Sequence, residues 1–475
     1  MNMEDLSNSL WLNSPFLFVT LTSLIALVVE AVRKNTLAVY FISLVGILAA
    51  LVATVLTFDN GESSFYGMMQ TGGYANYFTA IFLVSAGFTI VLSRQYMEQQ
   101  HAHRSEFYLL ILFATAGMIL MASAADLVMI FLGIELMSIS LYVLAGFMRT
   151  KITANEAALK YFLLGAFATG FLLYGIALVY GTAGTTNLPA IAGKFDALRN
   201  NTLFLIGVAM LIVAFSFKVA AVPFHMWAPD VYEGSPTTIT AFMSTGAKAA
   251  AFAAFVSVFL RTFDFTGGKV NEALAYISAA SMILGNIVAI AQSNLKRMLA
   301  YSSIAHAGYM LAGLAAANKE GQIGILFYLA AYTLMNLGAF GVISMIEKAD
   351  DKNLTFDDYA GLSTNRPFAA ALMAVFMFSL AGIPPFAGFF GKYYVFLAAI
   401  KANMVWLAVI GVLTSVVSVY YYLRVVVYMY FRDGSADLSA TPSVPALAAM
   451  SLAAIIILQL GIYPSFIVDL VQQFF

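Results

Sequence analysis

The 475-residue sequence contains no cysteine, and only 10% of its residues are charged. Without cysteine the chain cannot form disulfides, and it cannot hold an iron–sulfur cluster or a metal ion through thiolates. A soluble domain carries about 25% charged residues, so the low charge content argues against a soluble globular protein. The net charge of −1 does not indicate a nucleic-acid partner, and none is expected.

Long hydrophobic runs are abundant instead: 62% of the residues are hydrophobic and the mean hydropathy is +0.88. These values indicate an all-α polytopic membrane protein that lies in the lipid bilayer. The first ten residues, MNMEDLSNSL, lack a basic segment, so we expect the first apolar run to be a true span and not a cleaved signal peptide. Runs of about 20 residues, the length that crosses a bilayer, predict fourteen spans at 14–32, 36–58, 75–95, 106–124, 127–148, 156–180, 203–228, 237–260, 272–292, 296–316, 322–346, 368–399, 404–431 and 446–468.

The distribution of basic residues predicts the orientation of the chain. An even number of spans places both termini on one side of the membrane. With the termini outside, the inside loops hold twelve basic residues, among them Lys352, and the outside loops hold six. Because basic residues favour the inner side, we expect both termini on the outer side. We interpret the acidic inside loop 347–367 as a solvated connection and not as a docking site.

The predicted span 203–228 contains a lysine, a proline and a histidine within eight residues: Lys218, Pro223 and His225. A proline has no N–H and clashes with the carbonyl four residues earlier, here that of Val219, so the helix should be interrupted. The freed carbonyl must then face protein or water. A simple packing kink would also account for one such proline.

The predicted span 368–399 contains a second interruption of the same kind. Pro384 and Pro385 lie in mid-membrane, and Lys392 follows them. These prolines free the carbonyls of Leu380 and Ala381. Two interruptions, each near a lysine, favour a hydrated cavity over two unrelated kinks.

The two interruptions predict an internal repeat. Pro223 and Pro384 are 161 residues apart, and two five-span units would begin at 106 and 271, 165 residues apart. Because five is odd, successive copies cross the membrane in opposite senses, which makes the repeat inverted. The predicted division is an N-terminal three-helix segment, a first five-helix repeat, a second five-helix repeat and a C-terminal transmembrane helix, at 1–105, 106–262, 271–432 and 433–475.

Four ionisable residues are predicted deep within spans: Glu135, Lys218, Lys248 and Lys392. A charge at the bilayer centre costs about 2.5–3.5 kcal/mol, so four would cost about 10 kcal/mol unless they are paired or hydrated. Lysines near a span end, such as Lys160, can instead extend the amine to the interface. That explanation does not apply to Lys248, which lies near the middle of its span.

These residues suggest a path for protons. Burial lowers the pKa of a lysine and a nearby carboxylate raises it, so a carboxylate that moves can switch the proton affinity of the amine. Glu135 is the natural partner of Lys218. His225 and His306 could carry protons as neutral imidazoles or could simply bond neighbouring helices.

Two further groups of polar residues leave alternatives open. Ser302, Ser303 and His306 share one helix face and could hold a short water chain. Asp230 and Glu233 follow the first interruption, and we interpret them as part of a solvated inner turn, with a role in proton uptake as the alternative.

Several stretches resemble the antiporter-like membrane subunits of respiratory complex I, the proton-pumping NADH:quinone oxidoreductase, and in particular their N-type members. The most characteristic is PFHMWAPDVYEGSPTTITAFMSTGAK. Others are FLGIELMSISLYVL, LKRMLAYSSIAHAGYM, SLAGIPPFAGFFGKYYVF and LTSVVSVYYYLRVV. The resemblance extends from about residue 106 to about residue 430. A lysine at 392 is similar to N-type members, whereas M-type members have a glutamate there.

The resemblance implies a fold of fourteen transmembrane helices with two inverted five-helix repeats and discontinuous helices 7 and 12. It also implies roles for single residues. Glu135 and Lys218 would form the coupling ion pair, Lys248 the central relay and Lys392 the terminal residue. The connecting positions would be His225, His306 and, less clearly matched, Lys160.

The resemblance further implies where the chain works and with what. We expect no cofactor on this chain, because flavin, iron–sulfur clusters and quinone would lie on other subunits. Partners would be M-type and K-type membrane subunits in an energy-transducing membrane, bacterial or organellar. The expected function is proton translocation coupled to quinone reduction elsewhere in the complex. A cation/proton antiporter and a non-conducting scaffold are the alternatives, and the sequence does not identify the electron donor.

Overall fold

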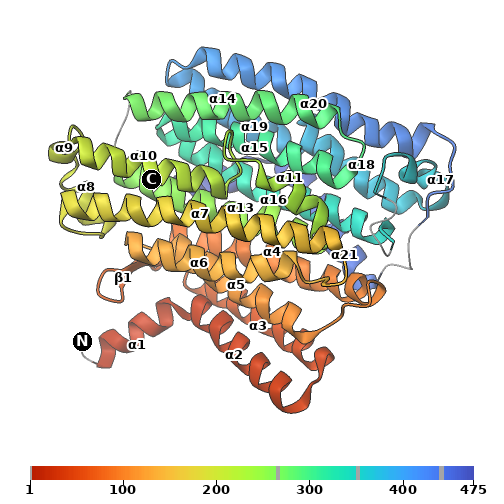
Figure 1. Cartoon of the computed structure of the whole chain (residues 1–475), viewed down its shortest axis with the longest axis horizontal. Helices are drawn as coiled ribbons and strands as arrows, with labels where there is room; N and C mark the ends of the chain where they lie inside the picture. Colours follow the sequence, from red (N-terminus) through yellow and green to blue (C-terminus); the bar gives the residue numbers. More distant parts are fainter. Residues whose placement is uncertain (1–2, 264–267, 349–353, 438–442, 475) are drawn as a thin grey trace.

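The computed structural model describes residues 3–263, 268–348, 354–437 and 443–474 and is built almost entirely of helices. The helices lie side by side in one bundle (Figure 1). Lys352, one of the residues behind the predicted orientation, lies outside the described residues. The predicted all-α membrane architecture is confirmed.

Within the described residues, eleven helices are long and apolar enough to cross a membrane. They coincide with eleven of the fourteen predicted spans. In order they are α2 Ser14–Arg33, α3 Thr36–Leu56, α4 Gly73–Gln99, α5 Ser105–Ser123, α6 Leu127–Ala145, α7 Ile152–Ala183, the continuous stretch Thr237–Thr262, α14 Lys269–Ile290, α16 Lys319–Ile346, α20 Val405–Phe431 and α21 Val444–Ile462.

The other three predicted spans are the two interrupted helices and α15 (Leu295–Ala316), which carries several polar residues. The first interrupted helix consists of α10 (Thr202–Lys218) and α11 (Trp227–Gly234). The second consists of α18 (Pro367–Ala381) and α19 (Ala387–Lys401). Both predicted interruptions are therefore confirmed.

Each predicted repeat contains five helical segments in the structure, counting an interrupted helix as one. The first holds α5, α6, α7, α10 with α11, and Thr237–Thr262. The second holds α14, α15, α16, α18 with α19, and α20. The boundaries of the four predicted domains and the inverted relation of the repeats stay predictions.

The stretch Thr237–Thr262 changes its helix type twice. It begins as α12 (Thr237–Phe242), continues as the π-helix η1 (Met243–Ala247), returns to α13 (Lys248–Val256) and ends as the π-helix η2 (Ser257–Thr262). Short π segments inside α-helices are common at functional sites. Lys248 is the first residue after one of them.

Several short elements were not anticipated from the sequence. The N-terminal residues form α1 (Met3–Leu12), and the hairpin of β1 (Ser63–Ser64) and β2 (Met69–Gln70) precedes α4. The remaining short helices are α8 Leu188–Ala192, α9 Phe195–Leu198, the 3-10 turn η4 Asp357–Tyr359, α17 Leu362–Asn365 and α22 Ser465–Gln472.

The predicted last span, 446–468, is wrong at its end. Helix α21 stops at Ile462, and α22 begins separately at Ser465. Pro464 lies between them, and a proline disfavours helical backbone in the residue before it. The apolar run therefore continues past the point where the helix ends.

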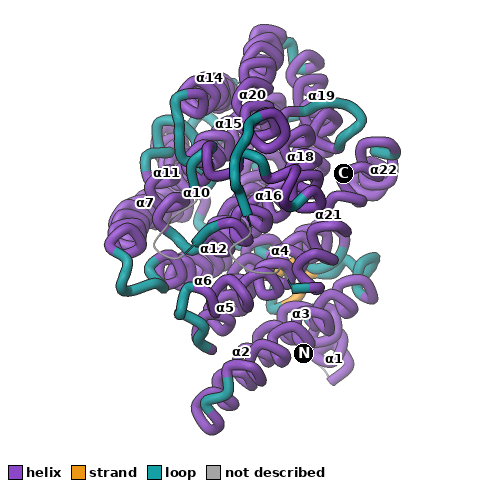
Figure 2. The backbone as a smooth tube through the Cα atoms, turned by 90° about the vertical axis from the view of Figure 1, so that its right-hand side faces the viewer, coloured by secondary structure: helices purple, strands orange, loops and turns teal. Residues whose placement is uncertain are grey.

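Burial is greatest at the centre of the bundle. In Thr237–Thr262 and in α16, 94% and 89% of the apolar window is buried, compared with 28% in α2. Figures 1 and 2 show α14 and α20 along one edge of the bundle and α2 and α3 along the opposite edge. Lys248 thus lies on the most buried of the candidate spans, where its amine cannot reach an interface.

Candidate functional site

Lys218 is the last residue of α10, directly before the first interruption. Its Nζ donates a hydrogen bond of 2.8 Å to Ser138 Oγ on α6. The next residue, Val219, caps the helix, and its carbonyl is the one that would have accepted a hydrogen bond from the missing N–H of Pro223. Trp227 Nε1 donates to the carbonyl of Phe217 at 2.9 Å, so the indole provides a hydrogen-bond partner for a buried backbone carbonyl at the end of the helix.

Glu135 lies on α6, one helical turn before Ser138. Its Oε1 accepts a hydrogen bond of 2.8 Å from Thr169 Oγ1 on α7. Among the described residues, Glu135 and Lys218 do not form the expected direct ion pair, because each has taken a hydroxyl partner instead. The two groups are still close enough to interact electrostatically. The arrangement places an acid and a base beside each other without direct contact.

Lys248 is 2% exposed and points toward α15. Its Nζ donates to the carbonyl of Ser303 at 2.7 Å and to Ser303 Oγ at 2.5 Å. The ring of Tyr332 lies 5.7 Å from the same nitrogen. One face of α15 therefore supplies the hydrogen-bond partners of the central lysine.

His306 is 1% exposed and lies one turn after Ser303 on α15. Its Nδ1 is 2.7 Å from the hydroxyl of Tyr328, and its Nε2 is 2.9 Å from the hydroxyl of Tyr422. Ser302 Oγ also bonds the Tyr422 hydroxyl. Ser302 and His306 therefore share Tyr422 as a partner, whereas Ser303 bonds Lys248, and the water chain along this face stays a prediction.

Lys392 lies on α19, is 5% exposed, and follows the second interruption. Its Nζ donates to the carbonyl of Ala381 at 2.8 Å and to Ser415 Oγ at 2.8 Å. Ala381 is the residue whose carbonyl Pro385 was expected to free, so the lysine amine occupies the position that a helical N–H would have taken. The predicted opening of the backbone and the buried lysine are thus one feature.

A set of tyrosines around His306 and Lys392 was missed from the sequence. Tyr309 places its ring 5.2 Å from Lys392 Nζ and its hydroxyl 3.0 Å from Asn286 Nδ2. Tyr421 donates to Asn286 Oδ1 at 2.8 Å. The only signal in the sequence was the run of tyrosines at 420–422 in an apolar helix. Tyrosines that only pack against neighbouring helices would give the same pattern.

His225 lies in the first interruption, but the structure does not connect it to the lysines. Its Nδ1 is buried and has no hydrogen-bond partner within the described residues. The expected link from Lys218 through His225 is therefore not formed by direct contacts in this conformation. Its role as a connecting residue stays a prediction.

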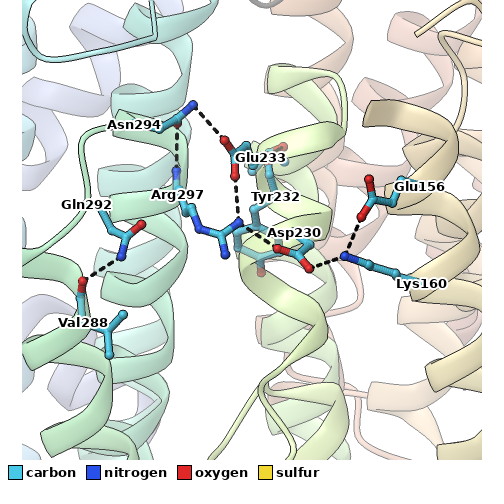
Figure 3. A network of polar contacts seen from close by, with 10 residues as sticks. Glu156, Lys160, Asp230, Tyr232, Glu233, Val288, Gln292, Asn294 and Arg297 are labelled. Carbon is cyan, nitrogen blue, oxygen red and sulfur yellow. Dashed lines mark hydrogen bonds and ion pairs between the residues drawn. The ribbon is translucent and has the colours of Figure 1, made fainter. Parts of the chain in front are cut away.

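Lys160 belongs to an ion-pair network that joins three helices (Figure 3). Its Nζ lies 2.6 Å from Glu156 on the same helix and 2.6 Å from Asp230 on α11. Arg297 on α15 reaches Asp230 at 2.7 Å and Glu233 at 2.8 Å. The Lys160 side chain is 39% exposed, so extension of its amine toward the interface stays possible, but the amine is paired with two carboxylates there.

The same network corrects the interpretation of Asp230 and Glu233. The predicted turn is wrong, since both residues lie within α11; their side chains are partly solvated, at 31% and 36% exposed. Asn294 Nδ2 donates to Glu233 Oε1 at 3.2 Å. The two carboxylates hold the second half of the interrupted helix between α7 and α15 (Figure 3).

The inside loop 347–367 was also misread at its first residue. Glu347 is 1% exposed and accepts a hydrogen bond of 3.0 Å from the Tyr96 hydroxyl, and another from Thr237 Oγ1. Lys296, one of the twelve basic residues counted in the inside loops, lies within α15, is likewise 1% exposed and donates to the carbonyl of Ser235 at 2.7 Å. Residues 349–353 of this loop lie outside the described residues.

The site does not resemble a metal centre. Among the described residues, no group of three or more His, Cys, Asp or Glu side chains gathers as metal ligands would. What the geometry offers is a series of amines, an imidazole, hydroxyls and a few carboxyls in a membrane interior. These groups can bind and transfer protons.

Comparison with known proteins gives consistent matches over nearly the whole chain. Residues 124–418 match the family model described as NADH:quinone oxidoreductase/Mrp antiporter, TM. The chain is 50% identical to NADH-quinone oxidoreductase subunit N of Trichlorobacter lovleyi, covering 95% of this chain and 93% of the relative. It is 46% identical to NADH-quinone oxidoreductase subunit N 1 of Chloroherpeton thalassium, covering 97% of each.

Solved structures agree in fold. A chain of respiratory complex I from Thermus thermophilus with bound aureothin matches with a TM-score of 0.85 and 37% identity, covering 96% of this chain and 98% of that one. A chain of the Mrp complex from Dietzia sp. DQ12-45-1b matches with the same TM-score but 22% identity, covering 97% of this chain and 96% of that one. The second match shows a shared fold only.

Proposed function

The chain belongs to the transmembrane family of NADH:quinone oxidoreductase and Mrp antiporter subunits, and we propose that it is an N-type membrane subunit that translocates protons in a quinone oxidoreductase complex. Its relatives at 42–50% identity bear the subunit N name. In this proposal the energy comes from quinone reduction on other subunits. This chain supplies the proton path.

The observation that carries the proposal is the buried line from Lys248 to Lys392. Lys248 contacts Ser303 on α15, and His306 follows on the same face. Both lysines lie close enough to His306 to act on it electrostatically. Tyr309 places its ring beside Lys392. Amines and an imidazole thus alternate with hydroxyls through the centre of the bundle, and each can accept and release a proton.

Glu135 and Lys218 would control loading of this line. Lys218 is now held by Ser138, one turn from Glu135 on the same helix. If Glu135 approaches, it stabilises the protonated amine, and if it withdraws, the amine releases its proton more readily. The present arrangement, with both groups on hydroxyl partners, corresponds to the separated state.

The alternatives fit less well. A Na⁺ site prefers several hard oxygen ligands, and no carboxylate cluster is found among the described residues. A passive scaffold would not need two lysines almost fully buried, each of which costs about 2.5–3.5 kcal/mol in a membrane centre. A role in proton transfer would account for the presence of these two lysines.

The proposal extends to what surrounds the chain. Flavin, iron–sulfur clusters and quinone would be held by other subunits, and M-type and K-type subunits would be the membrane neighbours. Both termini would lie on the outer side of an energy-transducing membrane, in keeping with the basic residues of the inside loops.

The first test replaces Lys392 by alanine in the assembled complex. Because a positioned proton-transfer group contributes about 10²–10⁴-fold, we expect Lys392→Ala to lower proton pumping in membrane vesicles at least about tenfold. The matched control is Lys401→Ala, on the same helix but at its exposed end and paired with Glu320. Normal pumping in Lys392→Ala would contradict the proposed path.

A further inference from the structure

We propose that Glu347 takes up protons at the inner side and passes them to Lys248 along buried hydroxyl groups between α4 and the stretch α12–η1. This inference rests on the proposed function and assigns to it an uptake path. The groups in the line from Lys248 to Lys392 are buried, since Lys248, His306 and Lys392 are at most 5% exposed. Such a line needs a separate source of protons.

Glu347 has the surroundings of a proton-binding group. It directly follows α16 and is 1% exposed. Oε1 accepts from the Tyr96 hydroxyl at 3.0 Å, and Oε2 accepts from Thr237 Oγ1. In the part of the chain that the structure describes, it forms no ion pair. Because hydroxyl groups both donate and accept, these partners can serve the carboxyl group with or without its proton.

A row of hydroxyls on α4 begins at this carboxyl group. Tyr96, Ser93, Thr89 and Ser85 are spaced by three and four residues and so lie on one face of the helix. All four are at most 2% exposed. In a helix otherwise rich in apolar residues, this face offers proton donors and acceptors over three turns.

A second row lies opposite, on α12 and η1. Ser93 Oγ donates to Thr238 Oγ1 at 2.8 Å, and Ser85 Oγ lies 2.7 Å from Thr245 Oγ1. The backbone N–H of Thr237 donates to the Tyr96 hydroxyl at 3.2 Å. The two rows therefore meet at both ends and form a buried polar seam inside the membrane.

The seam ends beside Lys248. Thr245 precedes Lys248 by three residues, within the π segment η1. The backbone comes so close to α4 there that a Cβ on Gly246 would lie 3.1 Å from Ser85 Oγ. Thr89 lies four residues from both Ser93 and Ser85, so it divides the distance between the two hydroxyl pairs into steps of about one helical turn, 5.4 Å. A bridging water molecule can complete a step of about that length.

The other end of the seam adjoins the protein surface. A small pocket of about 10 Å³ is lined by Gln95, Tyr96, Gln99, Ser344 and neighbouring residues. That volume is about the size that holds one water molecule. Tyr96 lines the pocket and also bonds Glu347, so it connects the carboxyl group with the inner surface.

The proposed transfer moves one proton in total, from Glu347 to Lys248. The O–H bond of the Glu347 carboxyl group breaks, and an N–H bond forms on the neutral amine of Lys248. Each intervening hydroxyl accepts one proton and donates another, so it is unchanged at the end. The Glu347 carboxylate then takes its next proton from the inner aqueous phase.

The test compares Glu347→Gln with Lys248→Ala in the assembled complex, with proton pumping and quinone reduction measured in the same vesicles. We expect Glu347→Gln to lower pumping at least about tenfold, as Lys248→Ala should, and Glu347→Asp to restore part of it. The matched control is Glu320→Gln, at the opposite, exposed end of α16, the helix that Glu347 directly follows. Its pumping should be unchanged.

The outcomes separate the two proposals. Normal pumping in Glu347→Gln together with loss in Lys248→Ala would overturn the uptake role and leave the proposed function standing. Normal pumping in both would overturn both. If Glu347→Gln does not assemble, Thr238→Val decides, since it removes one hydroxyl of the seam and keeps the side-chain shape. Reduced pumping in that variant supports the path, and unchanged pumping contradicts it.

Discussion

Lys248 and Lys392 are bound in a way that suits two protonation states. A protonated lysine amine has three N–H donors, and a neutral one has two donors and one lone pair. Lys248 donates two hydrogen bonds, both to Ser303, and Lys392 donates two, to Ala381 and Ser415. Two donations are possible in either state. Each lysine can therefore lose its proton without giving up a hydrogen bond.

Gly382 tests the position of Lys392 at the scale of one atom. Its φ is +82°, and an added Cβ would lie 3.1 Å from Lys392 Nζ. We expect Gly382→Ala to lower stability by about 1 kcal/mol or more through backbone strain, and to reduce pumping by displacing the amine. Pumping and thermal inactivation of the assembled complex are the measurements.

Gly184→Ala is the matched control for this substitution. Gly184 has a similar φ of +70°, but an added Cβ there would meet no neighbouring atom within 4 Å. It should show the strain without a loss of pumping. Equal pumping in the two variants would mean that the exact position of the Lys392 amine does not matter.

Charged residues within apolar runs were predictable from the sequence, and their partners were not. The cost of burial singles out Lys248 and Lys392 in any apolar helix. Tyr328 and Tyr422 gave no such signal, because a tyrosine in a membrane helix can pack or bond equally well. Glu347 was assigned to a loop because it follows the apolar run directly.

At the level of single elements, ion pairs attach the short helix α11 to both of its neighbours. This helix has only eight residues and lies between α7 and α15. Asp230 binds Lys160 on one side and Arg297 on the other (Figure 3). The three charges thus fix the half-helix that follows the interruption, next to the region that contains Lys218.

Asp230→Asn should loosen this attachment. We expect a loss of about 1 kcal/mol, because hydrogen bonds to a charged group are weakened and the site is partly exposed to solvent. Thermal inactivation of the purified complex at low salt measures the change. Asp196→Asn is the control, because the Asp196–Arg199 pair is far more exposed. An equally stable Asp230→Asn complex would show that packing alone holds α11.

The positions of the helices were predictable because a membrane span requires a long run of apolar residues. The interrupted helices were also accessible, since proline removes a backbone donor at a known place. The ends of the helices were harder to predict. Helix α7 runs over Ile152–Ala183, whereas the expected span was 156–180, and α21 stops before Pro464. Polar residues continue a helix beyond its apolar run when their backbone groups can still pair.

At the level of the whole molecule, Lys248 lies on the most buried of the candidate membrane spans. The stretch Thr237–Thr262 and α16 are almost enclosed, whereas α2, α3, α7 and α20 expose apolar side chains on the outer faces of the bundle. Leu21, Leu24 and Val28 of α2 are examples. Such faces suit lipid or neighbouring membrane subunits, and they keep the polar line away from the bilayer.

The most direct measurement of the central claim is proton pumping and quinone reduction in membranes that carry Lys248→Ala, after assembly of the complex has been verified. We expect pumping to fall at least about tenfold, either together with quinone reduction if the two are tightly coupled, or alone if they can be uncoupled. Lys319→Ala, an exposed lysine at the start of α16, should behave as the unmodified complex does. Unchanged pumping in Lys248→Ala would contradict the account and favour a non-conducting scaffold.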